Sequence, residues 1–161
     1  MAHSARTSWR LRALLAALFV GAGFGFLAAS GAAAEKGLEA LIFVTQTGEH
    51  KFEVEVADTE QTRARGLMRR RAMPQDHGML FDFREESAVS MWMKNTYIPL
   101  DMVFVSRKGA VVSIARDAEP MSERIIPSGG PVYAVIELNA GVAARLSLAP
   151  GDRVRHRIFE R

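Results

Sequence analysis

Cysteine is absent from this 161-residue chain, and its absence excludes several kinds of chemistry at once. Without a thiol there is no disulfide, no thiolate metal site and no cysteine nucleophile. Other signals of catalysis are also missing, since no serine lies in a Gly-x-Ser-x-Gly elbow and the four histidines show no metal-ligand spacing. We therefore expect a fold stabilised by packing, with no metal and no other cofactor.

A surplus of one charge is also lacking once the N-terminus is set aside. Three of the 21 basic residues, Arg6, Arg10 and Arg12, precede the first acidic residue, Glu35. Residues 35–161 therefore carry 18 basic and 18 acidic side chains. A balanced chain gives no electrostatic reason to expect nucleic acid as a partner.

The N-terminus has the pattern of a secretory signal peptide. The three arginines precede an uncharged apolar run from Ala13 to Ala29, and Ala32-Ala33-Ala34 offers small residues to signal peptidase. We predict a signal peptide over residues 1–34 and a periplasmic or otherwise exported protein of the bacterial cell envelope. The alternative is an uncleaved anchor, because an apolar run of about 18 residues is at the short end of a bilayer span. Only this segment would then contact the membrane.

Residues 35–161 fit one domain, and their hydrophobic pattern is mainly that of β-strands. Apolar and charged residues alternate from Lys51 to Val56, as in a half-buried strand. Other apolar runs lie at 41–45, 78–83, 88–93, 102–105, 110–115, 133–138 and 154–159, and short helices are expected at 60–68 and 141–146. The sequence therefore predicts a mainly β domain, an antiparallel β-sandwich or a partly closed barrel with one or two short helices. Residues 117–131, rich in proline and glycine, are expected to form a long surface loop.

The stretch from Met91 to Asp101 is the part that strand periodicity explains least well. A polar triplet, Lys94-Asn95-Thr96, interrupts the apolar pattern, and Ile98-Pro99 then turns the chain into a run that begins with an acid. A lysine can fix an anionic or carbonyl group, and an indole offers a flat apolar surface. We therefore predict a ligand site at this bend, with an unknown small molecule or envelope component as its partner. Its residues are Trp92, Lys94, Asn95, Thr96 and Asp101.

The same bend belongs to a series of motifs that extends over nearly all of residues 35–161. They are Arg65-Gly66-Leu67-Met68, Gly78-Met79-Leu80-Phe81, Trp92-Met93-Lys94-Asn95-Thr96, Ile98-Pro99-Leu100-Asp101, Pro131-Val132, Glu137-Leu138, Ala140-Gly141 and Gly151-Asp152. Through them the chain resembles the widespread bacterial and archaeal family known as domain of unknown function 192. The resemblance implies a compact, mainly β domain, commonly exported or membrane-tethered, without an established activity. The polar residues of the family motifs add Arg65 and Glu137 to the predicted site.

Two of the functions that this site would support depend on a ligand. The first is a cell-envelope accessory domain that binds a small ligand or a partner. The second is an uncharacterised enzyme acting on envelope carbohydrate or peptide, with a carboxylate acid-base group such as Asp101 working with Lys94 or Glu137. Two carboxylates that straddle a glycosidic bond must lie about 5 to 9.5 Å apart, a separation that the sequence does not specify.

The third possibility is a purely structural interaction domain. Asn95 and Thr96 would then satisfy backbone groups at a sharp bend, as short polar side chains do in turns. Asp101 would pair with Lys94 or Arg65, because a buried charge without a partner costs several kcal/mol. The same residues therefore support a binding site or a structural polar network.

Methionine is concentrated in the middle of the chain. Seven of the eight methionines lie between Met68 and Met121. Thioethers can bind copper(I), but methionine also fills irregular space in hydrophobic cores. Because Met91-x-Met93 has no histidine nearby to complete a mixed ligand set, we expect these residues to pack rather than to bind a metal.

Overall fold

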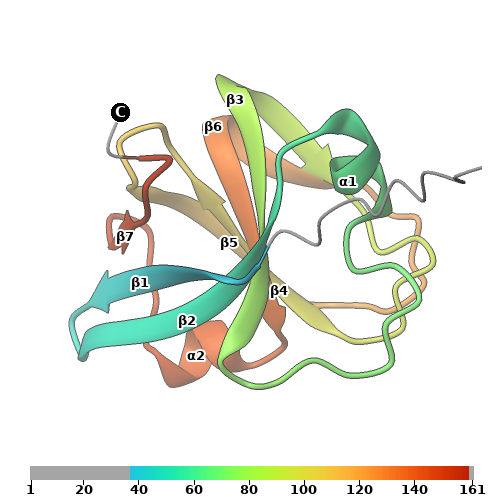
Figure 1. Cartoon of the computed structure of the whole chain (residues 1–161), viewed down its shortest axis with the longest axis horizontal. Coiled ribbons are helices and arrows are strands. Elements are labelled where there is room, and N and C mark those ends of the chain that lie inside the picture. Colours follow the sequence, from blue (N-terminus) through green and yellow to red (C-terminus); the bar gives the residue numbers. More distant parts are fainter. Residues whose placement is uncertain (1–36, 160–161) are drawn as a thin grey trace, which may run out of the picture. The chain divides into compact units, whose positions relative to one another are not determined.

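The computed structural model describes residues 37–159, so the predicted signal peptide at 1–34 lies outside the described residues. Within this range seven strands form one sheet in the order β5-β4-β6-β3-β2-β1-β7 (Figure 1). They are β1 (Glu39–Thr45), β2 (Gly48–Ala57), β3 (His77–Met91), β4 (Leu100–Val105), β5 (Val111–Ala118), β6 (Ile126–Asn139) and β7 (Arg153–Arg155). The helices are α1 (Glu60–Arg65) and α2 (Val142–Arg145). No helix in the described range is long and apolar enough to cross a membrane.

The two edges of the sheet meet at one end, which makes it a partly closed barrel. Ala110, just before β5, forms an antiparallel bridge with Arg153 in β7. Next to it, the amide of Val154 donates to the carbonyl oxygen of Gly109 at 2.7 Å. Glycine is needed there, because its φ is 74° and a Cβ atom would lie 2.5 Å from the Val154 carbonyl oxygen. The prediction of a mainly β fold with short helices is confirmed.

Strand β3 differs from its prediction. The runs at 78–83 and 88–93 were expected to be separate strands, but β3 continues from the first into the second and ends at Met91, with a shift of register against β6 between Asp82 and Ser87. Its first part pairs with β2 in parallel, whereas the other strand pairs are antiparallel. A parallel pair needs a crossover connection, and α1 with the segment after it returns the chain to the same end of the sheet.

The predicted loop at 117–131 is also shorter than expected. Residues 126–131 form the first part of β6, where Pro127 pairs with Ser90 and Pro131 pairs with Ala88 of β3. Strand β4 pairs with β6 only from residue 134 onward, so each proline lies where β6 has one neighbour. Proline lacks an amide hydrogen and is tolerated at such edge positions.

Strand β4 and the adjoining parts of β3 and β6 are buried on both faces. The barrel core lies inside the curled sheet and includes Leu41, Val54, Leu80, Val103, Ile136 and Val154. The outer core lies on the opposite face of β3, β4 and β6 and includes Leu67, Met79, Phe81, Met93, Met102 and Val135. Leu67 follows α1 and Met93 follows β3, so the segments around α1 and between β3 and β4 cover this outer face. Side chains of β4 alternate between the two cores.

Asp101 joins three elements within the barrel-core face. Its side chain is 0% exposed, and its two oxygens accept hydrogen bonds from the amides of Asp117 in β5 (2.9 Å) and Ala143 in α2 (2.8 Å). Hydrogen bonds to an ionised oxygen are stronger than neutral ones. The carboxylate therefore fastens β5 and α2 to β4.

Replacing Asp101 by Asn should lower the free energy of unfolding by about 1–3 kcal/mol, because one buried amide would then face an NH₂ group instead of an oxygen. Urea denaturation of the purified variant measures this change. Asp152→Asn is the matched control, since the Asp152 carboxylate accepts from one amide, Ala149, at a solvent-exposed turn. A stability loss for Asp101→Asn no larger than that of the control would contradict the assigned role.

Candidate functional site

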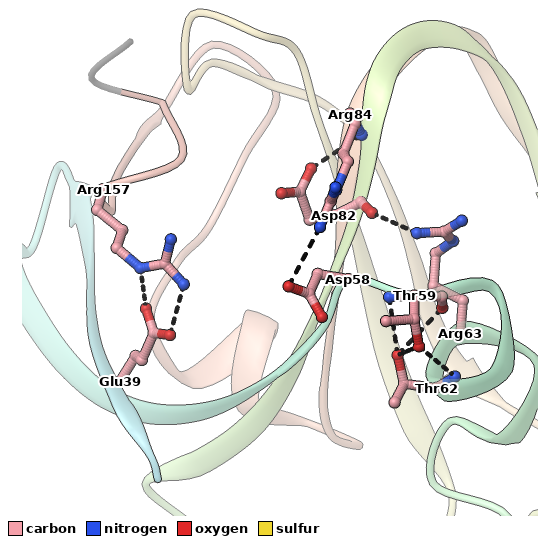
Figure 2. A network of polar contacts seen from close by, with 8 residues as sticks. All are labelled: Glu39, Asp58, Thr59, Thr62, Arg63, Asp82, Arg84 and Arg157. Carbon is pink, nitrogen blue, oxygen red and sulfur yellow. Dashed lines mark hydrogen bonds and ion pairs between the residues drawn. The ribbon is translucent and has the colours of Figure 1, made fainter. Parts of the chain in front are cut away.

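Helix α1 is fastened beside β3 by capping and by one arginine (Figure 2). Thr59 and Thr62 form a capping box in which each side-chain oxygen accepts from the other residue's amide, at 3.1 and 3.0 Å. Arg63 Nη1 then donates to the carbonyl oxygen of Asp82 at 2.9 Å, and its guanidinium lies 5.6 Å from the centroid of the Phe83 ring. These contacts hold the last turn of α1 against β3.

The bend between β3 and β4 is held in place by its backbone. The amide of Arg69 donates to the carbonyl oxygen of Asn95 at 2.8 Å, and the amide of Met121 donates to that of Thr96 at 3.0 Å. Asn95 has a φ of 56°, in the left-handed region that asparagine tolerates better than most residues. The bend is therefore attached to the segment after α1 on one side and to the segment before β6 on the other.

A pocket of about 260 Å³ lies between α1, β3 and this bend. Its apolar lining comprises Ala64, Leu67, Met68, Phe81, Phe83, Met91 and Trp92. Its polar lining comprises Arg63, Arg65, Ser90, Lys94, Thr96 and Glu137. Apolar walls with a few polar groups are typical of small-molecule sites.

Glu137 is the one acid that lines the pocket among residues 37–159. It lies in β6 on the outer-core face, directly between Met79 of β3 and Met102 of β4, and is 4% exposed. Within the described residues no hydrogen bond or ion pair reaches its carboxyl group. Burial raises the pKa of Glu137 to about 8, because an ionised carboxylate loses its hydration there. The group is therefore mainly protonated at neutral pH.

Three cations line the same pocket but differ in their partners. Arg63 donates a hydrogen bond to the carbonyl oxygen of Asp82 in β3. Lys94 Nζ lies 3.3 Å from a Glu123 carboxylate oxygen and 5.4 Å from the centroid of the Trp92 ring. The guanidinium of Arg65 has no hydrogen-bond or ion-pair partner in the described part of the chain. No ion pair joins any of the three cations to the carboxyl group of Glu137 in the described residues.

The structure gathers five of the seven predicted site residues around the pocket, namely Arg65, Trp92, Lys94, Thr96 and Glu137. Asn95 is next to them but is outside the lining, and its backbone serves the bend. Asp101 is on the other face of the sheet, because its neighbour Met102 pairs with Glu137 and successive side chains alternate. Its carboxylate contacts neither Lys94 nor Arg65.

Several lining residues were not anticipated from the sequence. Phe81 and Phe83 come from β3 and could have been found from their two-residue spacing after Met79, which places all three side chains on one face. Arg63 and Met68 come from α1 and the turn after it, where the run of arginines gave no sign of which one faces inward.

Metal ligands do not gather in the described part of the chain. No group of three or more His, Asp or Glu side chains there could hold an ion. Met73, Met79, Met93 and Met102 are buried in the outer core, where their flexible side chains fill space between the sheet and the covering segments.

Comparisons with known proteins agree with the motifs. A family model described as DUF192, "Uncharacterized ACR", matches residues 42–156. The crystal structure of a "putative transcription regulator" from Sinorhizobium meliloti 1021 is 48% identical, covers 75% of this chain and 95% of that chain, and has a TM-score of 0.73. A protein of unknown function from Novosphingobium aromaticivorans DSM 12444 is 39% identical, covers 74% and 85%, and has a TM-score of 0.72. No curated protein matches.

The family match includes every residue that lines the pocket, from Arg63 to Glu137. It confirms the resemblance seen in the sequence motifs. The chain therefore belongs to the family of domain of unknown function 192 (DUF192).

Proposed function

We propose that this domain is a small-ligand-binding accessory module of the cell envelope, with the pocket beside α1 as its binding site. The observation that carries this proposal is Glu137, an acid that is 4% exposed and has no partner within the described residues. Its carboxyl group lines the pocket and bonds to no described residue, so it is available to bond to a ligand there.

The place of Glu137 in the sheet supports a role in binding. Its cross-strand neighbours Met79 and Met102 are both apolar, so a leucine or methionine would suit the outer core better than an acid does. Side chains that break a local rule of packing without compensation concentrate at functional sites. The carboxylate of Asp101, in contrast, accepts a hydrogen bond at each of its two oxygens and stabilises the fold, as the structural alternative predicts for that residue.

One observation also favours the enzyme alternative. A carboxyl group with a pKa raised to about 8 in an accessible pocket is suited to general acid or base catalysis. An enzyme on envelope carbohydrate or peptide would have to use Glu137 alone, because Asp101 lies on the opposite face of the sheet. Binding requires only the pocket, and we therefore prefer it.

The description of the Sinorhizobium relative concerns transcription, but we propose no nucleic-acid partner for this chain. Residues 35–161 carry 18 basic and 18 acidic side chains. Proteins that bind nucleic acid owe most of their affinity to a surplus of basic groups.

Replacing Glu137 by Gln should stabilise the protein increasingly as the pH rises. Below pH 4.5 both the folded and the unfolded wild-type chain hold the Glu137 proton, whereas between pH 4.5 and about pH 8 only the folded state holds it. The wild type therefore loses stability across this window by on the order of a few kcal/mol, and the non-titrating variant does not.

Urea denaturation at several pH values measures this difference in stability between Glu137→Gln and the wild type. Glu85→Gln, at an exposed position of β3, is the control. A stability difference between Glu137→Gln and the wild type that does not change with pH would contradict the unpaired buried acid.

A thermal-shift screen of metabolites and glycans tests binding itself. We expect at least one compound to raise the melting temperature of the wild type, since a ligand at about 100 times its Kd adds about 2.7 kcal/mol. The shift should be lost in Arg65→Ala and Lys94→Met, because both side chains line the pocket. Arg145→Ala is the matched control, since Arg145 ends the short helix α2 as Arg65 ends α1 but is not in the lining. Shifts that survive in both pocket variants would place the binding elsewhere.

The envelope location is a separate part of the proposal and rests on the pattern of residues 1–34. We expect a C-terminally tagged protein to appear in the periplasmic fraction with a new N-terminus near Glu35. Intact-mass spectrometry of the fractionated protein measures this. A full-length chain in the membrane fraction would instead support the anchor, and an unprocessed chain in the cytosol would contradict export.

A further inference from the structure

We infer that the ligand is a small organic anion with an uncharged oxygen at its far end, so that Arg65 and Lys94 bind the anion and the carboxyl group of Glu137 donates a hydrogen bond to the oxygen. This inference rests on the proposed binding function and names its ligand class. It follows from three features of the pocket: the exposed cations in its lining, the buried acid, and the lack of an ion pair between them in the described residues.

The first feature favours an anionic group. Arg65 is exposed, lines the pocket and has no side-chain partner in the described part of the chain. Lys94 pairs with Glu123, but their side chains are 41% and 65% exposed, and such surface pairs are worth only about 0–1 kcal/mol. A carboxylate or phosphate can therefore displace Glu123 and pair with both cations. Because the lining holds three cations and one acid, a cationic ligand would be repelled.

The second feature favours an uncharged oxygen at the other end. Glu137 is buried between two methionines and keeps its proton at neutral pH, because burial raises its pKa to about 8. A protonated carboxyl group offers one O–H donor, which a carbonyl, ether or hydroxyl oxygen can accept. An ammonium group would have to give up its hydration beside apolar walls and then find three acceptors. The neutral acceptor avoids both costs.

The third feature requires two separate ends. In the described residues no ion pair joins Glu137 to a cation of the pocket, and Glu137 is buried whereas Arg65 is exposed, so the cationic and acidic groups occupy different parts of the pocket. An apolar section with Phe81, Phe83 and Trp92 in its walls lies in the same pocket and suits a flat ring. The volume of about 260 Å³ is slightly below the range of about 300–1,000 Å³ usual for drug-sized ligands. A single substituted ring is therefore a suitable size for the part of the ligand that the pocket holds.

Four single-ring probes test each part of this inference by NMR or calorimetric titration of the purified protein. The probe 4-acetylbenzoate has both an anion and a neutral oxygen. Three related compounds each change one end: 4-ethylbenzoate lacks the oxygen, acetophenone lacks the anion, and 4-(aminomethyl)benzoate carries an ammonium group. We expect 4-acetylbenzoate to bind at least about tenfold more tightly than each of the other three, as one well-formed hydrogen bond or ion pair allows.

The pH dependence and one substitution identify the group that meets the oxygen. Affinity for 4-acetylbenzoate should fall about tenfold between about pH 6.5 and about pH 9, as Glu137 loses its proton. The charged groups that face the pocket besides Glu137 are Arg63 and Arg65 from the α1 side and Lys94 from the bend, while Met79 and Met102 do not titrate. Glu137→Gln keeps an N–H donor, so it should keep the affinity and lose the pH dependence. Arg65→Ala should weaken binding at every pH.

Each other result would overturn the inference. If 4-(aminomethyl)benzoate binds most tightly and Glu137→Gln abolishes that binding, the pocket prefers a cation at the acid and the proposed binding function still stands. If none of the four probes binds below about 10 mM, which corresponds to less than about 3 kcal/mol, the ligand class is wrong. The binding function is then tested separately by the thermal-shift screen, in which Arg65→Ala should remove the shift.

Discussion

Burial of the central strands on both faces is the constraint on which the rest of this structure depends. Strands β3, β4 and β6 have the barrel core on one side and the outer core on the other. A side chain of β4 is therefore buried whichever way it points, and all six residues of that strand are. Any acid at a buried position of these strands must find a partner, keep its proton or destabilise the fold.

Two acids in neighbouring strands meet this constraint in opposite ways. Asp101 in β4 is ionisable and fully buried, and two backbone amides from β5 and α2 satisfy its oxygens. Glu137 in β6 faces the outer core, where no described group bonds to it, and its raised pKa is the result. The first arrangement holds elements together, and the second leaves a donor at the inner side of an open pocket. The pocket lies between α1, β3 and the bend, and Glu137 is among its lining residues.

Local pattern predicted much of the fold. The alternation from Lys51 to Val56 identifies β2, and the short helix expected at 60–68 is present as α1, which ends at Arg65. The parallel pairing of β2 with β3 was not predicted, because the connection between them contains only one short helix and resembles a loop in sequence. The strand at 126–131 was missed for a related reason, since its two prolines are acceptable only because β6 has one neighbour there.

By itself the sequence determined the family, the β-rich character of the chain and the unusual bend that carries Trp92, Lys94 and Thr96, because these depend on residues close together along the chain. Tertiary structure alone decided which distant residues join them. The register of β4 against β6 places Glu137 beside Met102 and turns Asp101 to the opposite face, and a shift of one residue would put both acids on the same face. Strand register is set by contacts between segments far apart in sequence. Spacing along the chain therefore could not show that Asp101 stabilises the fold and that Glu137 lines the pocket.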